Sequence, residues 1–572
     1  MNPPILTSKG KKYPPVIENI EDWPIYKLSE DRDQFIKEID EFTFKRLMRK
    51  SPDKVSDLLA KTIYLERIRV KEEPWKVDPP NDRQFWSKTR KELVRKSLDK
   101  EETAALNSNK KILKTIISRY SEEIVGTFNI GTFLFARKFL TVFFRRLLNA
   151  AAGRNFRRLW GAKRNLFNHV KVEGETDAIR NLMKKGTVVV VPTHFSNLDS
   201  IVIGFAMDYV LGLPSFCYGA GLNLYNTGYT AYFMNRLGAY RVDRRKKNPI
   251  YLETLKAMSN LSIQRGTNSL FFPGGTRSRS GAIEKRLKMG LMGTAVEAQR
   301  ALCQKGNKDK IFIVPLVLNY HFVLEAQYLI EQHLKATGKE HYLNLKDASY
   351  SRRKILKFIW KLFSETSEII LNFGKPLDVL GNFVDKEGIS RDQHGNEIDI
   401  SEYFISEGNV KEDLQREVEY TKILADKVAE RYHKENIVLS SQLVAFTTFN
   451  ILMSQNDDLD LYGVLRLPSE DYVFEMETVA KAINEVRKKL YKMEKEGQLK
   501  LSEQIHWETI DLIKHGVANL GNYHALKPLK INKKGNIESE DFKVLYYYHN
   551  RLENYDLHKS IQWKSFEMAI AD

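Results

Sequence analysis

The chain has 572 residues, of which 42% are hydrophobic and 29% are charged, and it carries a formal net charge of +18. This composition excludes a disordered chain, and the length allows a main domain with substantial flanking parts. The excess of Lys and Arg favours an anionic partner, which is nucleic acid, an acidic membrane surface or a phosphorylated substrate.

The cysteines and the apolar segments further limit the class of protein. The two cysteines, Cys217 and Cys303, lie far apart without CxxC or Cys/His spacing, so the sequence predicts neither a disulfide framework nor a metal site. The first residues lack the pattern of a signal peptide. No apolar stretch reaches the roughly 18 residues of a spanning helix. We therefore expect a protein that lies on a membrane without crossing it.

The first 165 residues are expected to form two parts. Residues 1–115 begin with Pro-rich extended chain and then show apolar residues every three or four positions, which predicts a helical N-terminal region. Residues 116–165 form a second part, in which large aromatic side chains alternate with nine Lys or Arg residues and no acidic residue from Arg137 to Arg164. That composition is typical of an amphipathic helix facing lipid phosphates. A core helix with a solvated basic face is the open alternative.

From about residue 166 the pattern changes to short β-branched runs separated by segments of helical period. The runs at 186–192, 269–273, 311–318 and 368–376 are apolar on both faces, as buried strands are. Strands that alternate with helices predict an α/β fold. Within it, residues 378–413 are rich in Asp, Gly and Asn and predict an irregular insertion. We place the α/β domain at 166–400 and a helical C-terminal region at 401–572.

The first motif that carries chemistry is "HFSNLD", directly after the strand at 186–192. His194 begins a loop and Asp199 begins a helical run, so the carboxylate can fold back on the imidazole and make it a general base. The alternative is structural, since Ser196 and Asp199 also match a capping box for the following helix.

The second motif is a cluster of cations, "RVDRRKK", at 241–247. Guanidinium groups bind phosphate oxygens with two parallel hydrogen bonds, so Arg241, Arg244 and Arg245 are candidates for a phosphorylated substrate. The alternative is a solvated basic face.

The third motif is "FFPGGTRSRSG" at 271–281. Glycines let a backbone approach phosphate, and hydroxyl and guanidinium groups donate to it, which makes Gly275, Thr276, Arg277 and Ser278 candidates. Neither a Walker loop nor a dinucleotide fingerprint is present. A strand-ending turn is the alternative.

The fourth motif is "IVPLVLNYHFVLEAQY" at 313–328, a buried strand that runs into a more polar segment. Pro315 inside an apolar strand predicts a sheet edge or a bulge, which sheets often place beside a site.

Taken together and in this order, the four motifs resemble those of the glycerolipid acyltransferases, specifically the glycerol-3-phosphate and dihydroxyacetone-phosphate acyltransferases. The blocks appear here as "HFSNLD", "GAYRVDRR", "GGTRSRSG" and "VPLVLNYHFVLE". The resemblance continues in "FGKP", "NIVLSSQLVAFTTFNIL" and "YYYHNRLENY", and this C-terminal extent favours the glycerol-3-phosphate branch. About two thirds of the chain is covered, and residues 1–115 only faintly.

Two positions depart from the family pattern. The third block normally begins with Glu, where this chain has Gly274, so either that block has another role or another group substitutes for the carboxylate. The second block reads Val242-Asp243-Arg244, which is closer to the lysophosphatidate acyltransferases. Acceptor identity is therefore less determined than reaction type.

The resemblance implies a domain with a central mixed sheet flanked by helices, and an acyl transfer from acyl-CoA or acyl carrier protein to the sn-1 hydroxyl of glycerol 3-phosphate. His194, oriented by Asp199, would be the base, and no cofactor would be needed beyond the acyl donor. The residues implied in substrate binding are Arg241, Arg244, Arg245, Gly275, Thr276, Arg277, Ser278 and Pro315.

The sequence also suggests where the protein is located and which other functions it could have. We expect peripheral attachment to an anionic membrane, on the cytoplasmic face of the cell membrane. The alternatives are a lysophosphatidate acyltransferase and a non-catalytic lipid or membrane scaffold. Nucleic-acid binding is disfavoured, because the sequence contains no recognised RNA or DNA module.

Overall fold

The computed structural model describes residues 12–50, 54–97, 102–151, 170–225, 228–338, 368–468, 472–521 and 524–566. Within these ranges no helix has both the length and the apolarity that crossing a membrane requires. The same ranges contain no cluster of three or more His, Cys, Asp or Glu side chains placed to hold a metal ion.

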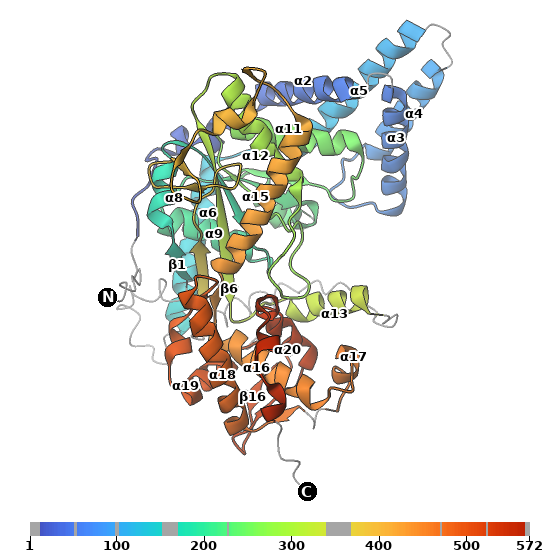
Figure 1. Ribbon diagram of the computed structural model, residues 1–572. Coiled ribbons are helices and arrows are strands. Elements are labelled where there is room, and N and C mark those ends of the chain that lie inside the picture. The colour runs from blue at the N-terminus through green and yellow to red at the C-terminus, as the bar shows by residue number, and fades with distance from the viewer. Residues whose placement is uncertain are drawn as a thin grey trace.

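Helices make up the N-terminal part, at the upper right of Figure 1. Their bounds are α1 Pro24–Glu30, α2 Arg32–Lys50, α3 Val55–Glu72, α4 Asp82–Ser97 and α5 Glu102–Ile124. Trp86 and Tyr120 are fully buried among them, in an apolar core that also includes Tyr240, Tyr251 and Met258 from further along the chain. The helical prediction is confirmed for the described residues, and α5 continues past the predicted boundary at 115.

A sixth helix, α6 (Ile130–Ala151), covers the first half of the predicted basic segment. It exposes Leu134, Phe135 and Phe139, and Phe135 stacks on Phe233 with ring centroids 6.0 Å apart. Residues 152–165 of the predicted segment lie outside the described residues.

A seven-stranded mixed sheet forms the centre of the molecule, in the order β1-β7-β6-β2-β5-β3-β4. The strands are β1 Val170–Gly174, β2 Gly186–Pro192, β3 Cys217–Gly221, β4 Ala239–Val242, β5 Ser269–Leu270, β6 Lys310–Tyr320 and β7 Ile369–Phe373. Strands β6, β2, β5, β3 and β4 are parallel, whereas β7 is antiparallel to β6 and parallel to β1. The mixed α/β fold is therefore confirmed, although the strand predicted at 269–273 is only two residues long.

Helices cover both faces of this sheet (Figure 1). Alternate residues of β2 point to opposite faces, so Val188 and Val190 pack in one apolar core and Val189 and Val191 in another. This double burial explains the unbroken apolar run "VVVV". The helices of this domain are α8 Thr176–Leu182, α9 Asp199–Phe205, α10 Gly228–Met234, α11 Pro249–Gln264, α12 Met289–Gln304, α13 Ala326–Thr337 and α15 Leu414–Lys434.

The parallel strands bring the four motifs to one edge of the sheet. The first three motifs follow β2, β4 and β5, and the fourth motif contains the carboxyl end of β6. These four strands run in the same direction. Loops at the carboxyl ends of parallel strands meet at one edge, where α/β proteins usually place their sites.

Pro315 lies in β6, which has β2 on one side and β7 on the other, so the predicted edge position is wrong. Pro315 is opposite Val191 of β2, and its carbonyl accepts a hydrogen bond from Gly374 on the other side. Gly374 lies just beyond β7, where the partner strand becomes irregular, so the missing N–H of proline interrupts no regular ladder.

Short β-hairpins fill the predicted irregular insertion at 378–413. They are β8 Phe383–Val384, β9 Ser390–Arg391, β10 Glu397–Ile398, β11 Ile405–Ser406 and β12 Asn409–Val410.

The C-terminal region packs around α16 (Ser440–Gln455), whose first 13 residues are all buried. The other helices are α17 Leu461–Val464, α18 Met476–Lys495, α19 Thr509–Asn519 and α20 Phe542–His549, with short strands β13 Ile437–Val438, β14 Val473–Phe474, β15 Lys500–Leu501, β16 Lys530–Ile531 and β17 Ile537–Glu538. A helix buried on all sides shows no amphipathic stripe, in agreement with the run "LVAFTTFNIL".

Candidate active site

His194 and Asp199 form a hydrogen-bonded pair at the carboxyl end of β2. The Nδ1 atom of His194 lies 2.8 Å from Oδ2 of Asp199. The imidazole keeps 16% of its side-chain surface exposed, whereas Asp199 is fully buried. A carboxylate that accepts from Nδ1–H leaves Nε2 free to accept a proton, which is the arrangement of a general base.

Three further donors hold the carboxylate of Asp199 in place. The backbone amides of Phe195 and Ser196 donate to Oδ2 at 2.7 and 3.0 Å, and the hydroxyl of Tyr320 donates to Oδ1 at 2.6 Å. Asp199 is also the first residue of α9. The N-cap of α9 is Leu198 and makes no side-chain capping bond, so the predicted Ser196 cap is wrong, although Asp199 accepts from the Ser196 amide while it pairs with His194.

The third motif lies directly against His194. The amide of Ser278 donates to the carbonyl oxygen of His194 at 2.7 Å, and the Phe272 ring stacks on the imidazole with centroids 4.1 Å apart. The hydroxyl of Ser278 donates to the carbonyl of Ala282 at 2.7 Å. Ser278 therefore fixes the turn with both of its donors, and its predicted hydroxyl contact with substrate would need this bond to break.

The turn itself depends on Gly275. Its φ of +77° is unfavourable for other residues, and a Cβ there would lie 2.7 Å from the side chain of Lys288. Thr276 is half-buried and follows this turn. The strand-ending turn, which the sequence left open as the alternative, is present, and the phosphate role of Gly275 and Thr276 stays a prediction.

Arg277 is joined to the His194 loop through Glu325. One guanidinium nitrogen of Arg277 lies 3.2 Å from Oε1 of Glu325. The same carboxylate accepts from the amide of Asn197 at 3.0 Å and from the hydroxyl of Ser196 at 2.9 Å. Glu325 is buried, so this network fixes Arg277 relative to the base.

Arg244 completes a pair of neighbouring cations. It is exposed, and no hydrogen bond or ion pair connects it to another of the described residues. Partial desolvation and the positive charge of Arg277 lower the pKa of Arg244. Two guanidinium groups that repel each other in this way could accommodate an anion between them, so the phosphate role of Arg244 and Arg277 stays a prediction.

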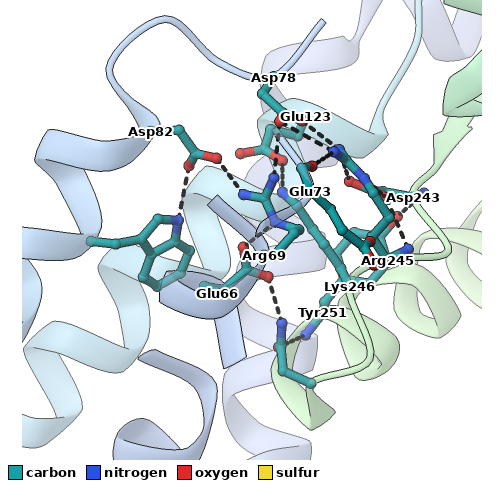
Figure 2. A network of polar contacts seen from close by, with 12 residues as sticks. Glu66, Arg69, Glu73, Asp78, Asp82, Glu123, Asp243, Arg245, Lys246 and Tyr251 are labelled. Atoms are coloured by element: carbon teal, nitrogen blue, oxygen red, sulfur yellow. Dashed lines mark hydrogen bonds and ion pairs between the residues drawn. The ribbon is translucent and has the colours of Figure 1, made fainter. Parts of the chain in front are cut away.

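Arg245 does not belong to that site. Its five N–H groups donate to the carboxylates of Asp78 and Asp243 and to the carbonyl of Glu73, as Figure 2 shows. The guanidinium also lies over the Trp75 ring at 4.2 Å. Because no donor is left for phosphate, the predicted substrate role of Arg245 is wrong, and its function is to attach β4 to the N-terminal part.

The same network continues through neighbouring buried charges (Figure 2). Lys246 pairs with Glu123, and Arg69 pairs with both Glu66 and Asp82. These contacts join α3, α4 and α5 to the segment after β4. The N-terminal part is thereby fixed to the segment after β4 that carries Arg244, and two of the five cations in the predicted basic cluster, Arg245 and Lys246, are structural.

Arg241 points toward the N-terminal helices as well. Its guanidinium donates to Oδ1 of Asn235 at 2.6 Å and lies over the Tyr225 ring at 5.2 Å. It lines an open cleft of about 1100 Å³ together with residues of α2 and α5. The structure thus brings Arg244 and Arg277 together, and the substrate role of Arg241 stays a prediction.

Pro315 lies on the face of β6 that it shares with Ile313 and Val317, which belong to the core under α12 and α15. No contact found among the described residues joins Pro315 to the side chain of His194. Its predicted role in shaping a pocket remains untested.

Three residues outside the predicted site set hold the site together. Tyr320 and Glu325 come from the fourth motif, where they had been quoted without a role. Arg551 comes from the C-terminal region, is fully buried, donates to Leu318 and Asn319, and lies 4.2 Å over the Phe195 ring. Sequence spacing gives no signal for Arg551, because its partners, which include Asn436, lie at least 115 residues earlier.

The segment after α20 also forms hydrogen bonds with the loop that contains the third motif. Side-chain amides of Asn550 and Asn554 each donate at 2.9 Å, to the carbonyls of Ser280 and Ile283. The "YYYHNRLENY" segment therefore contacts the loop that carries Arg277.

Comparisons with known proteins agree with this geometry. Residues 169–319, which hold all four motifs up to Asn319, match the family model described as Acyltransferase. The chain therefore contains an acyltransferase domain. It is 24% identical over 296 residues to a glycerol-3-phosphate acyltransferase from Pseudoalteromonas atlantica, and 27% identical over 249 residues to one from Aeromonas hydrophila. Over the matched residues the chain is thus similar to glycerolipid acyltransferases.

These matches cover only part of each protein. They span 51% and 43% of this chain, and 32% and 28% of the two relatives. Among solved structures, a 1-acyl-sn-glycerophosphate acyltransferase from Thermotoga maritima aligns over 66% of this chain and 93% of its own, with 14% identity and a TM-score of 0.24. A TM-score this low does not establish a shared fold.

Proposed function

We propose that this chain transfers an acyl group from a thioester donor, acyl-CoA or acyl carrier protein, to the sn-1 hydroxyl of glycerol 3-phosphate. The observation that carries this proposal is the juxtaposition of the His194–Asp199 pair with two neighbouring guanidinium groups. The two bacterial relatives, both named glycerol-3-phosphate acyltransferase, support the choice of acceptor.

In this reaction His194 acts as the general base. Nε2 accepts the proton of the acceptor hydroxyl while the hydroxyl oxygen attacks the thioester carbonyl. Asp199 holds the imidazole in the required tautomer and stabilises the imidazolium that forms. Collapse of the tetrahedral intermediate breaks the C–S bond and expels the thiolate, which takes up the proton. No covalent acyl-enzyme is needed.

Arg244 and Arg277 bind the phosphate of the acceptor. Their mutual repulsion is relieved when a dianion lies between them, which favours phosphorylated over neutral acceptors. Because Glu325 ties Arg277 to Ser196 and Asn197, the distance between phosphate and base is set by the protein. That distance selects which hydroxyl of the acceptor meets Nε2.

Membrane attachment is part of the proposal. Phe135 and Phe139 are 59% and 54% exposed on α6, next to Tyr232 on α10, which is 49% exposed. Exposed aromatic side chains beside a basic segment fit the interface of an anionic bilayer. We place the protein peripherally on the cytoplasmic face of the cell membrane, where an amphiphilic product can enter the lipid.

One assay tests the proposed function. The purified chain is given palmitoyl-CoA or palmitoyl carrier protein with glycerol 3-phosphate, dihydroxyacetone phosphate or 1-acyl-glycerol 3-phosphate as acceptor. We expect the highest kcat/KM with glycerol 3-phosphate. A preference for 1-acyl-glycerol 3-phosphate would instead establish the lysophosphatidate reaction. The absence of transfer to any acceptor would identify a non-catalytic scaffold.

A further inference from the structure

Glu284 carries an unpartnered carboxyl group next to the site. It lies in the loop between β5 and α12. Both of its carboxylate oxygens are buried, and neither has a partner in hydrogen-bonding geometry within the described parts of the chain. A buried polar group without partners destabilises the folded state. Such a group at the edge of an active site points to a functional role.

The carboxyl occupies the place of a side chain at position 274. An ideal Cβ built on Gly274 would lie 2.8 Å from Oε1 of Glu284 and 3.3 Å from its Cδ. The backbone of Gly274 does not have the positive φ of Gly275, so its conformation suits any residue. Only the Glu284 side chain prevents a side chain at 274.

The surroundings of this carboxyl connect it to the base. Burial raises the pKa of Glu284 to about 7, and the charge of Asp199 acts in the same direction. The backbone amides of Glu284 and His194 and the charge of Arg551 act against this rise. Tyr432 of α15 is a further titratable group beside it. The carboxyl thus lies under the loop of His194 and is partly ionised at neutral pH.

From these contacts we propose that Glu284 supplies the carboxylate that position 274 lacks, and that it is a positioning residue for the loop carrying His194. The inference rests on the proposed function, because it takes His194 as the base. Glu284 lies against Gly274 in the turn of the third motif, and the amide of Ser278 from the same motif donates to the carbonyl of His194. Glu284 therefore acts on the backbone of His194 through this turn.

The first experiment replaces the carboxylate by a neutral group of the same shape, Glu284→Gln. We expect kcat with glycerol 3-phosphate to fall by about 10-fold, because small displacements of a base are costly. Since the folded pKa lies above the unfolded value near 4.5, wild-type stability falls as the pH rises through 7. Glu284→Gln removes that loss, so its Tm at pH 8 should rise by about 1 to 3 °C.

Glu173→Gln is the matched control. Burial also raises the pKa of Glu173, which lies on β1 at the edge of the sheet. We expect this variant to keep wild-type kcat at pH 8, where its Tm should rise as well. A Glu284→Gln variant with a higher Tm and a lower kcat than wild type would show that Glu284 positions the site and does not stabilise the fold. Full activity of Glu284→Gln would overturn the proposal.

The second experiment moves the carboxylate. Gly274→Glu alone places two carboxyl groups in one desolvated space, and Glu284→Ala alone leaves none, so each should lower kcat by at least about 10-fold. The double variant Gly274→Glu/Glu284→Ala restores one carboxylate and should exceed both single variants in kcat. A double variant no more active than the weaker single variant would overturn the proposal.

Thermal unfolding keeps this test separate from the proposed function. If wild type transfers no acyl group, the proposed function fails, but the four Tm values still show whether positions 274 and 284 share one space. We expect the double variant to be more stable than the sum of the two single shifts predicts. Additive shifts would contradict a shared space.

Discussion

The amide of Ser278 donates a 2.7 Å hydrogen bond to the carbonyl oxygen of His194. This bond joins the loop of His194 to the loop of Arg277, and the two loops follow neighbouring parallel strands, β2 and β5. Changes in one loop are therefore transmitted to the other, so substitution effects at these positions should not be additive.

Removal of the base is the most direct prediction. His194→Ala should lower kcat by at least about 10²-fold, because general-base catalysis contributes a factor of about 10² to 10⁴. The measurement is steady-state acyl transfer together with thermal unfolding. His394→Ala, on an exposed hairpin, is the control and should retain full activity. A His194→Ala protein that still turns over near the wild-type rate would remove His194 from the mechanism.

The proposed binding of the acceptor phosphate by Arg244 and Arg277 predicts a selective change in the KM for the acceptor. Arg277→Ala should raise KM for glycerol 3-phosphate by about 10- to 100-fold and leave KM for the acyl donor nearly unchanged, since a charge-assisted contact contributes about 1.5–3 kcal/mol. Arg244→Ala should act in the same direction. Arg83→Ala, exposed on α4, serves as the control. Equal increases in both KM values would argue against a phosphate contact.

Arg245 is expected to act on stability and not on acceptor binding. Arg245→Ala leaves the buried carboxylates of Asp78 and Asp243 without their main partner, which should cost about 3 kcal/mol of unfolding free energy. Denaturant unfolding measures this loss. At a temperature where the variant is folded, its KM for glycerol 3-phosphate should equal that of wild type. A KM increase as large as that of Arg277→Ala would reinstate Arg245 as a substrate ligand.

Membrane binding should depend on the aromatic surface of α6. Phe135→Ser/Phe139→Ser should lower the fraction that floats with vesicles containing phosphatidylglycerol, because two large apolar side chains no longer enter the bilayer. Salt should weaken binding of the wild type. Leu414→Ser/Val418→Ser, exposed on α15, is the matched control. Equal flotation of both double variants would exclude this surface.

Acid should destabilise the C-terminal region through buried histidines. Burial lowers the pKa of His524 and His549 to about 4. Because an unfolded histidine titrates near 6.5, the unfolded state binds more protons between pH 6.5 and 4, and stability falls as the pH falls. Each histidine should cost about 2 kcal/mol at pH 5. His549→Phe should flatten the pH dependence of urea unfolding, whereas His394→Ala should not.

The sequence predicted the layers of the fold and the pair at the centre of the site. The main strands could be predicted because a strand buried on both faces is an unbroken apolar run in the sequence. The pair of His194 and Asp199 could be predicted because the two residues are close in the chain. The short β5 escaped correct prediction, since residues 271–273 are as apolar as a strand and yet turn toward Gly275.

What could not be predicted depends on distant partners. Arg244 and Arg245 are neighbours with the same chemistry, and it is the positions of Asp78, Asp243 and the Glu73 carbonyl that bind Arg245. Glu284 resembles any surface glutamate until the backbone of Gly274 is placed against it. Charge clusters reveal their role only when the carboxylates of other segments are known.

The contacts of Asn550 and Asn554 with the third motif have a consequence for synthesis of the chain. Roughly 360 residues separate His194 from Asn554, and translation at about 5 to 20 residues per second takes about 20 to 70 s to cover them. In the later part of that interval, once β7 (Ile369–Phe373) has been made, the nascent protein can form its central sheet but still lacks the amides that bind the carbonyls of Ser280 and Ile283. Acyl transfer should therefore begin only after the ribosome has released Asn550 and Asn554. A chain stalled before these residues should fold its central sheet and show no acyl transfer.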